Sequence, residues 1–341
     1  MFSHFSSVRR LAGVSLLGAL VAGCSAAGTP AAYNANPSAR SLAAGGVQAN
    51  RILASGRSRR EQPAGSNAHG WLSREAKGHK GKNVIYWGSY DSNTITIFSS
   101  KGVNGKQEGQ IVTGLSNPER LFVDKKHNVY ATNIGNNTIT AYKPGQTSPF
   151  LTVSNGVNSP TGLTVDAAGT VYCANVGNNT ITEYPKGSTS PSLTVQLSGS
   201  PEYLATDAHD NLYVAIGLDV LEFAPGSTTG TNLGLDIGSP GALEVDRSGN
   251  IIVIDESKPS IDVFPAGQTE PSKQIAVTRG FPFAISLSKS EKQVYVSVEA
   301  NSGPFVIQAL AYPNGSTLTD KLTTAGGDWP IAVSPDAVLG S

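Results

Sequence analysis

The feature that most constrains the fold of this chain is a repeat led by proline. A proline precedes an apolar segment of strand length at intervals of 39 to 48 residues, at positions 118, 160, 201, 240, 282 and 330. A second apolar strand follows in the first five repeats, and then a third in which apolar and polar residues alternate. Repeats of about 40 to 50 residues built from short strands are typical of β-propeller blades.

The number of repeats predicts six blades. Residues 83–115 supply the later strands of one blade but lack the proline-led first strand, and a strand of that type follows Pro330 at residues 331–333. Pairing these two segments would remove the open edges that a linear array of sheets exposes. We therefore predict an all-β fold, a six-bladed β-propeller closed by a C-terminal strand.

Each third strand ends in an aromatic residue, with a glycine three residues later. Glycine at that place predicts a turn with positive φ before the outer strand. The pairs are Tyr142/Gly145, Tyr184/Gly187, Phe223/Gly226, Phe264/Gly267 and Tyr312/Gly315.

One repeat carries a recognisable family pattern. Residues 160–172 read Pro-x-Gly-Leu-x-Val-Asp-x-x-Gly-x-Val-Tyr, and residues 174–181 read Ala-Asn-x-Gly-Asn-Asn-x-Ile. This pattern resembles the NHL repeat, and the resemblance extends over residues 83–336. It implies a propeller fold without implying one activity, because NHL-like propellers include scaffolds, ligand binders and a few enzymes.

The N-terminal segment has the features of a bacterial export signal. Arg9 and Arg10 precede an apolar run at residues 11–22, which is too short to span a membrane. The last four residues of the segment, Val-Ala-Gly-Cys, resemble the lipobox of bacterial lipoproteins, which implies that Cys24 is lipidated. The alternatives are an ordinary secretory signal and an uncleaved anchor. In a Gram-negative cell, Ser25 would imply sorting to the outer membrane.

Charge and composition divide the chain into three parts. Residues 1–24 carry a net charge of +2, residues 25–82 carry +7 and residues 83–341 carry −9. Residues 25–69 are rich in small and polar residues without periodicity, which predicts a disordered basic tether. The predicted parts are therefore a signal peptide (1–24), this tether (25–69) and a propeller (70–341). We expect no nucleic-acid binding, because the tether lacks interleaved aromatics and the propeller is acidic.

Candidate binding residues gather on one face of the predicted disc. In an up-and-down blade, the first strand begins on the same face as the turn between the second and third strands. We call this face A and the opposite one face B. Inner strands border a central channel, the usual place for a ligand. The predicted ligand-binding residues are Glu119, Arg120, Asn133, Asn175, Glu202, Tyr203, Asp255, Glu299 and Trp329. In the alternative interpretation, Asn133 and Asn175 cap turns and the acids are solvated rim charges.

The residues that usually perform catalysis are scarce. His127 and His209 fall in turns on face B, so no histidine pair is placed for a zinc site or for acid–base work. Cys173 lies in an apolar strand, where a lone thiol is usually a small buried hydrophobe. We therefore predict no catalytic residue and no cofactor. The alternative is a divalent cation held by carboxylates of the channel.

These features favour a lipid-anchored, extracytoplasmic binding or scaffold module of the bacterial cell envelope. We expect it to be a monomer held to the membrane by its lipid, with a protein, glycan or surface ligand on face A and no turnover. The alternative is a metal-dependent lyase or lactonase, because the fold is shared by gluconolactonase-like and virginiamycin-lyase-like propellers. Five extra residues near positions 299–304 also fall on face A, as a recognition loop or as neutral decoration.

Overall fold

A computed structural model describes residues 84–99, 107–301, 305–324 and 330–333, of which 319–324 are described by their backbone alone. All of them belong to one compact unit. The predictions for Cys24, for the tether and for Trp329 fall outside these residues.

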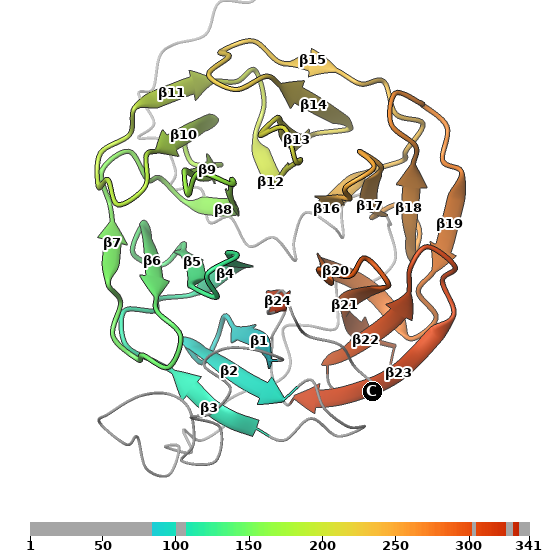
Figure 1. Cartoon of the computed structure of the whole chain (residues 1–341), viewed down its shortest axis with the longest axis horizontal. Coiled ribbons are helices and arrows are strands. Elements are labelled where there is room, and N and C mark those ends of the chain that lie inside the picture. Colours follow the sequence, from blue (N-terminus) through green and yellow to red (C-terminus); the bar gives the residue numbers. More distant parts are fainter. Residues whose placement is uncertain (1–83, 100–106, 302–304, 325–329, 334–341) are drawn as a thin grey trace, which may run out of the picture. The chain divides into compact units, whose positions relative to one another are not determined.

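The described residues form 24 strands and no helix, arranged as six four-stranded antiparallel sheets around a central axis (Figure 1). Nothing among them could therefore cross a membrane as a long apolar helix. The predicted all-β, six-bladed propeller is confirmed.

We number the blades in chain order and give the strands of each from the axis outward. Blade 1 contains β24 (Ile331–Val333), β1 (Val84–Ser89), β2 (Thr94–Ser99) and β3 (Gln107–Ile111). Blade 2 contains β4 (Pro118–Val123), β5 (Val129–Asn133), β6 (Thr138–Tyr142) and β7 (Leu151–Val153). Blade 3 contains β8 (Pro160–Val165), β9 (Val171–Asn175), β10 (Thr180–Tyr184) and β11 (Leu193–Gln196).

The other three blades follow the same order. Blade 4 contains β12 (Pro201–Thr206), β13 (Leu212–Ile216), β14 (Asp219–Phe223) and β15 (Thr231–Asn232). Blade 5 contains β16 (Pro240–Val245), β17 (Ile251–Asp255), β18 (Ser260–Phe264) and β19 (Lys273–Ala276). Blade 6 contains β20 (Gly280–Leu287), β21 (Gln293–Ala300), β22 (Phe305–Ala311) and β23 (Thr317–Thr324).

The inner strands contact one another in sequence around the axis. β4 contacts β8, β8 contacts β12, β12 contacts β16 and β16 contacts β20, while β24 contacts both β20 and β4. β24 pairs with β1 in the register Ile85↔Val333, Tyr86↔Ala332 and Trp87↔Ile331. Strands from opposite ends of the sequence therefore share blade 1 (Figure 1).

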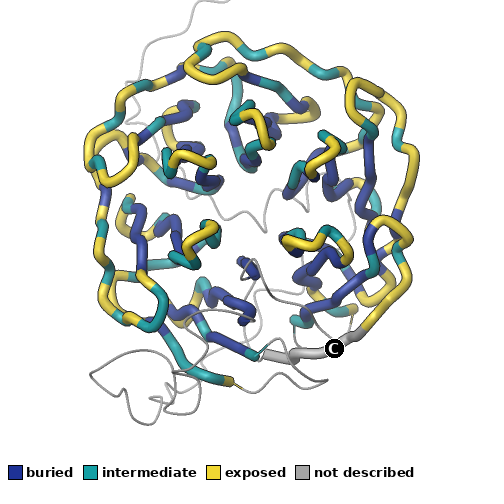
Figure 2. The backbone as a smooth tube through the Cα atoms, in the orientation of Figure 1, coloured by how far each residue is buried: buried dark blue, intermediate teal, exposed yellow. Residues whose placement is uncertain are grey.

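The hydrophobic core is divided among the contacts between neighbouring blades. Successive side chains of a strand point to opposite faces of its sheet, so each blade buries apolar side chains against both neighbours. Six buried clusters result, and each combines residues of two adjacent blades. Figure 2 shows the same pattern, with buried inner and middle strands and an exposed outer rim. Cys173 is among the fully buried residues, as predicted.

The turns predicted to need glycine do have positive φ. The angles are 78° at Gly145, 76° at Gly187, 71° at Gly226, 71° at Gly267 and 81° at Gly315. Most side chains would be strained in this conformation.

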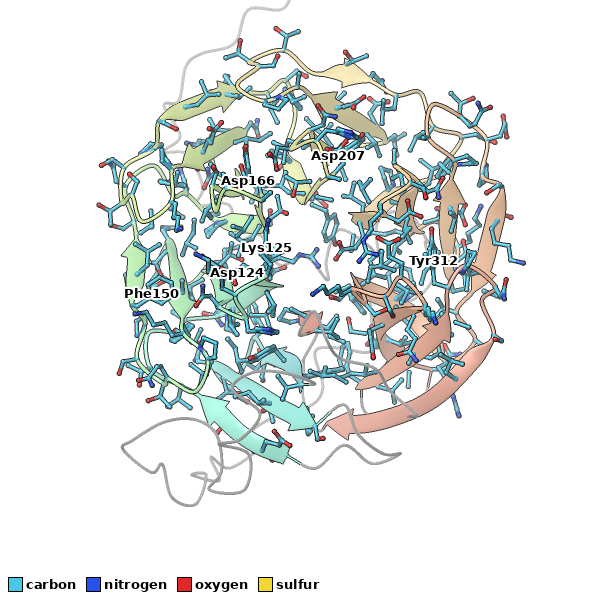
Figure 3. The ribbon with its side chains drawn as sticks, viewed as in Figure 1. Asp124, Lys125, Phe150, Asp166, Asp207 and Tyr312 are labelled. Carbon is cyan, nitrogen blue, oxygen red and sulfur yellow. The ribbon has the colours of Figure 1, made fainter. Side chains whose placement is uncertain are left out.

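An aspartate at the end of the inner strand organises the next turn in blades 2 to 5. Asp124, for example, accepts hydrogen bonds from the backbone N–H groups of Lys126 and Asn128 and from the hydroxyl of Tyr130. Asp124, Asp166 and Asp207 lie at corresponding places of successive blades (Figure 3).

Blade 5 keeps this arrangement through a residue of its neighbour. Ile252 stands where blades 2 to 4 have a tyrosine, and Tyr312 of blade 6 donates its hydroxyl to Asp246 instead, at 2.8 Å. The aspartate therefore keeps a phenol donor, which now joins two blades.

Candidate functional site

The strand register defines the two faces of the disc. Pro118 at the start of β4 is opposite Asn133 at the end of β5, so both lie on face A, and Val123 is opposite Val129 on face B. The same order in the other blades places the first residues of β8, β12, β16 and β20 on face A.

Each of these inner strands has a register shift in its face A half. In blades 2 and 4, the register shifts lie between Pro118 and Arg120 and between Pro201 and Tyr203, so Glu119 and Glu202 are the extra residues. Thr161 is the extra residue of blade 3. Bulges redirect side chains and are common beside functional sites. Two residues predicted to bind ligand thus occupy the redirected positions.

An arginine and a tyrosine from different blades meet at the face A end of the channel. The Arg120 guanidinium lies over the ring of Tyr203, 4.5 Å from its centroid. The Tyr203 hydroxyl donates a hydrogen bond of 3.2 Å to Oε1 of Glu256, which follows β17. Cation–π stacking and this hydrogen bond hold the three side chains together.

Carboxylates surround this group. Burial and the nearby charge of Glu202 raise the pKa of Glu256 to about 7, against the opposing effects of Tyr203 and Arg120. Burial also raises the pKa of Glu244, on β16, to about 7, although Arg120 and a backbone hydrogen bond lower it. We call Arg120, Glu202, Tyr203 and Glu256 the mouth cluster, and its members come from β4, β12 and the turn after β17. Glu244 lies deeper in the channel, opposite Ile252 and one residue from the face B end of β16.

The mouth cluster opens into a central cavity of about 180 Å³. Residues of all six inner strands line it, and Arg120, Tyr203 and Glu244 are among them. A cavity of this size holds a side chain or a few waters, whereas drug-sized ligands occupy about 300 Å³ or more.

Three other predicted residues are engaged within their own blades. Asn133 accepts a hydrogen bond from the N–H of Ser116 and donates to Thr140, and Asn175 makes the equivalent bonds to Asn158 and Thr182. Asp255, at the same place in blade 5, accepts from the N–H groups of Gly238, Ser239 and Ser257. All three are fully buried. They fix the entry to the inner strand, so we do not include them in the mouth cluster.

The remaining predicted residues are less closely connected to the mouth cluster. Burial raises the pKa of Tyr203, and the charges of Glu256, Glu202 and Glu119 raise it further, with the smallest effect from Glu119. Glu299 is exposed at the end of β21, opposite Phe281. Within the described ranges, no three His, Cys, Asp or Glu side chains are grouped so that they could hold a metal ion.

The predicted ligand-binding residues did not include Glu244 or Glu256. A signal for Glu244 was present, since it is the charged residue at the fifth inner-strand position, where blades 2 to 4 have Phe122, Thr164 and Ala205. The contact of Glu256 with Tyr203 joins residues 53 positions apart and has no counterpart in the repeat pattern.

The raised pKa values predict a pH-dependent stability. Glu244 and Glu256 bind protons more tightly in the folded chain than their ordinary pKa of 4.5 implies, so folding loses stability as pH rises from about 4.5 to 7. We expect a lower melting temperature at pH 8 than at pH 5.5. In Glu244→Gln and in Glu256→Gln, the difference in melting temperature between these two pH values should be smaller than in the wild type. Calorimetry at both pH values measures this. An unchanged difference in both variants would contradict it.

Comparisons with known proteins identify the class of fold. The chain matches no protein-family model and no curated protein. Among solved structures, one chain of a nidogen/laminin complex is similar with a TM-score of 0.61 and 16% identity, over 75% of this chain and 99% of that chain. Virginiamycin B lyase from Staphylococcus aureus is similar with a TM-score of 0.51 and 13% identity, over 77% and 84%. At these identities the similarity establishes a shared β-propeller fold.

Proposed function

We propose that this protein is a lipid-anchored, extracytoplasmic binding module that recognises a basic segment of a partner protein on face A. The observation that carries the proposal is the mouth cluster, in which the carboxylates of Glu202 and Glu256, from blades 4 and 5, lie close to one guanidinium. Burial and mutual repulsion raise the pKa of Glu256 to about 7, so an incoming cationic side chain would relieve an existing electrostatic cost.

The N-terminal sequence supports the location. A lipid on Cys24 and a basic tether would hold an NHL-like propeller near anionic head groups. The tether and the propeller carry opposite charge, so the acidic propeller and not the tether is suited to a basic partner.

Capture from the cell envelope tests the proposal. A full-length Cys24→Ser variant, which we expect in the soluble extracytoplasmic fraction, serves as the reference protein. In this background, Glu202→Lys should reduce the recovery of a cross-linked partner at least tenfold, because it places a cation beside Arg120. The bulge positions of the sister blades hold Thr161 and Phe283, so the backbone there accepts varied side chains.

Glu270→Lys is the matched control, since Glu270 is an exposed acid outside the mouth cluster. Equal loss of the partner in both variants would indicate a general charge effect and contradict the proposal. Turnover of a lactone or cyclic ester that depends on an added divalent ion would instead support the lyase or lactonase alternative.

A further inference from the structure

A second cavity lies on face B, between blades 4 and 5. It measures about 480 Å³, whereas the equivalent cleft between blades 3 and 4 measures about 20 Å³. The polar residues that line the larger cavity include Asp207, His209, Tyr213, Glu222, Asn232 and Gln268. We call this cavity the face B groove.

The outer strands of the two blades also differ. In blade 3, β11 has four residues and pairs with β10 from Thr180 to Glu183. In blade 4, β15 has two residues, Thr231 and Asn232, and pairs with β14 only at Leu221 and Glu222. β15 therefore covers only the face B half of β14, and Leu233 and Leu235, which follow it outside the strand, line the groove.

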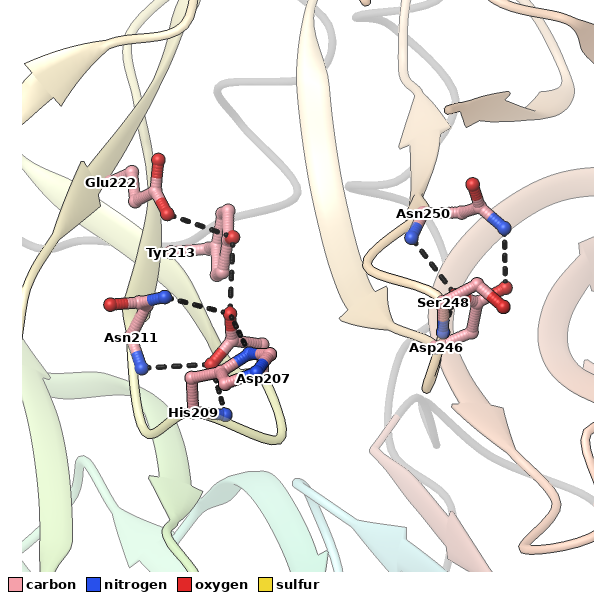
Figure 4. A network of polar contacts seen from close by, with 8 residues as sticks. All are labelled: Asp207, His209, Asn211, Tyr213, Glu222, Asp246, Ser248 and Asn250. Carbon is pink, nitrogen blue, oxygen red and sulfur yellow. Dashed lines mark hydrogen bonds and ion pairs between the residues drawn. The ribbon is translucent and has the colours of Figure 1, made fainter. Parts of the chain in front are cut away.

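The polar wall of the groove can accept further hydrogen bonds. The Tyr213 hydroxyl lies 3.0 Å from Oε1 of Glu222 and 3.4 Å from Oδ2 of Asp207 (Figure 4). A phenol has one proton, and Asp207 already accepts N–H bonds from His209 and from the backbone and side chain of Asn211. The phenol proton therefore goes to Glu222, whose carboxylate retains room for donors from a ligand.

The other charged residues of the groove already have local partners. Asp246 accepts bonds from Ser248, from Asn250 and from the Tyr312 hydroxyl. Arg247 forms an ion pair with Glu291 at 3.5 Å. The wall thus offers the Glu222 carboxylate, the exposed His209 and the amides of Gln268 and Asn232, of which Asn232 already donates to Asp219 and accepts from the N–H of Gly234.

Apolar side chains form the rest of the lining. Leu233 and Leu235 follow β15 and are half-buried, and Ile251 lies on β17. A pyranose carries hydroxyl groups around its edge and apolar C–H groups on its faces. It therefore matches a wall that combines polar and apolar side chains. The volume also falls within the range of about 300 to 1,000 Å³ that is usual for small-molecule sites.

We infer that the face B groove binds a short, neutral oligosaccharide, with its hydroxyl groups on Glu222, His209 and the amides of Asn232 and Gln268. This site is separate from the mouth cluster and does not depend on the function proposed for face A.

A panel of immobilised neutral glycans, followed by calorimetric titration of the best di- or trisaccharide, tests the inference on the full-length Cys24→Ser variant. Glu222→Ala should weaken binding at least tenfold, because it removes the main acceptor. Ala266→Trp should do the same by filling the groove from its exposed edge.

The sister cleft provides matched controls. Glu183 is opposite Tyr172 as Glu222 is opposite Tyr213, so Glu183→Ala makes the same change beside a cavity too small for a sugar. Ala224→Trp adds the same bulk at an exposed turn of that cleft. We expect both controls, and Glu202→Lys, to bind the sugar like the reference. The inference is overturned if no glycan binds at millimolar concentration, if Ala266→Trp binds normally, or if only cationic probes such as spermidine bind.

Discussion

Deleting residues 331–341 should lower the free energy of unfolding by about 3–6 kcal/mol or more. This deletion removes β24, whose Ile331 and Val333 are almost completely buried, and a fully buried side chain of this size contributes about 1.5–3 kcal/mol. It also leaves the inner edge of β1 unpaired and removes the bond from the N–H of Val333 to the Ser286 hydroxyl. We propose that β24 closes the ring, so its loss should also make unfolding less cooperative.

Denaturant unfolding followed by circular dichroism measures both effects. The control is a chain that lacks only residues 334–341 and keeps β24, and it should unfold like the full-length protein. Equal stability of the two shortened chains would show that the pairing of β24 with β1 does not close the ring.

Replacing Lys258 by methionine should have the second largest effect. Nζ of Lys258 lies 3.0 Å from Oδ2 of Asp255 and 3.2 Å from Oδ2 of Asp262, and both carboxylates are fully buried. Removing one partner of a buried ion pair costs about 3–5 kcal/mol. Because the lysine side chain is 43% exposed and solvent screens its charge, we expect about 2 kcal/mol.

The pH dependence separates this effect from lost packing. Hydrogen bonding to Asp255 raises the pKa of Lys258, and bonds from Ser257 and Lys258 lower the pKa of Asp255 although burial opposes them. The contribution of Lys258 to folding stability is complete below the ordinary pKa of lysine and is lost as pH rises through its higher pKa in the folded protein. The contribution of Asp255 is complete above the ordinary pKa of aspartate and is lost as pH falls through its lower pKa in the folded protein. Between about pH 5 and 10, the bridge should therefore be constant in the wild type.

In Lys258→Met, Asp255 loses the hydrogen bond from Lys258 that lowers its pKa, so the pKa of Asp255 rises. The variant should therefore regain part of its stability as pH falls from 8 to 5, on top of any change that it shares with the wild type. Lys258→Arg keeps the charge and should lose less stability. Lys273→Met, at an exposed position of β19, should behave like the wild type. A deficit in Lys258→Met that is the same at pH 5 and pH 8 would assign the lysine a packing role.

The sequence was sufficient for the repeated part of the fold. Strand positions, the aromatic–glycine turns and the number of blades follow from residues that recur at a fixed period. The structure adds features that depend on contacts between blades. Blades 2 to 4 have a tyrosine at the position of Ile252, and in blade 5 Tyr312 of the next blade donates the hydrogen bond to Asp246 instead. No repeat pattern encodes such an exchange.

The candidate site was predictable only in part. The inner-strand pattern placed Arg120 and Tyr203 on the same face, but their stacking depends on the bulges that redirect the start of each inner strand. A bulge adds one residue without changing the spacing of the repeats. The face B groove was missed because its lining combines residues of blades 4 and 5, and the repeat pattern does not encode contacts between blades.

Site-specific photocrosslinking in living cells tests the central claim most directly. Thr161 is the bulge residue of β8, and β8 lies between the strands that carry Arg120 and Tyr203. A photoreactive benzoylphenylalanine at position 161 should yield one discrete cross-linked partner. The same group at position 125, an exposed position on face B, should not yield that partner. A partner captured from position 125 and not from position 161 would contradict the assignment of the binding surface to face A.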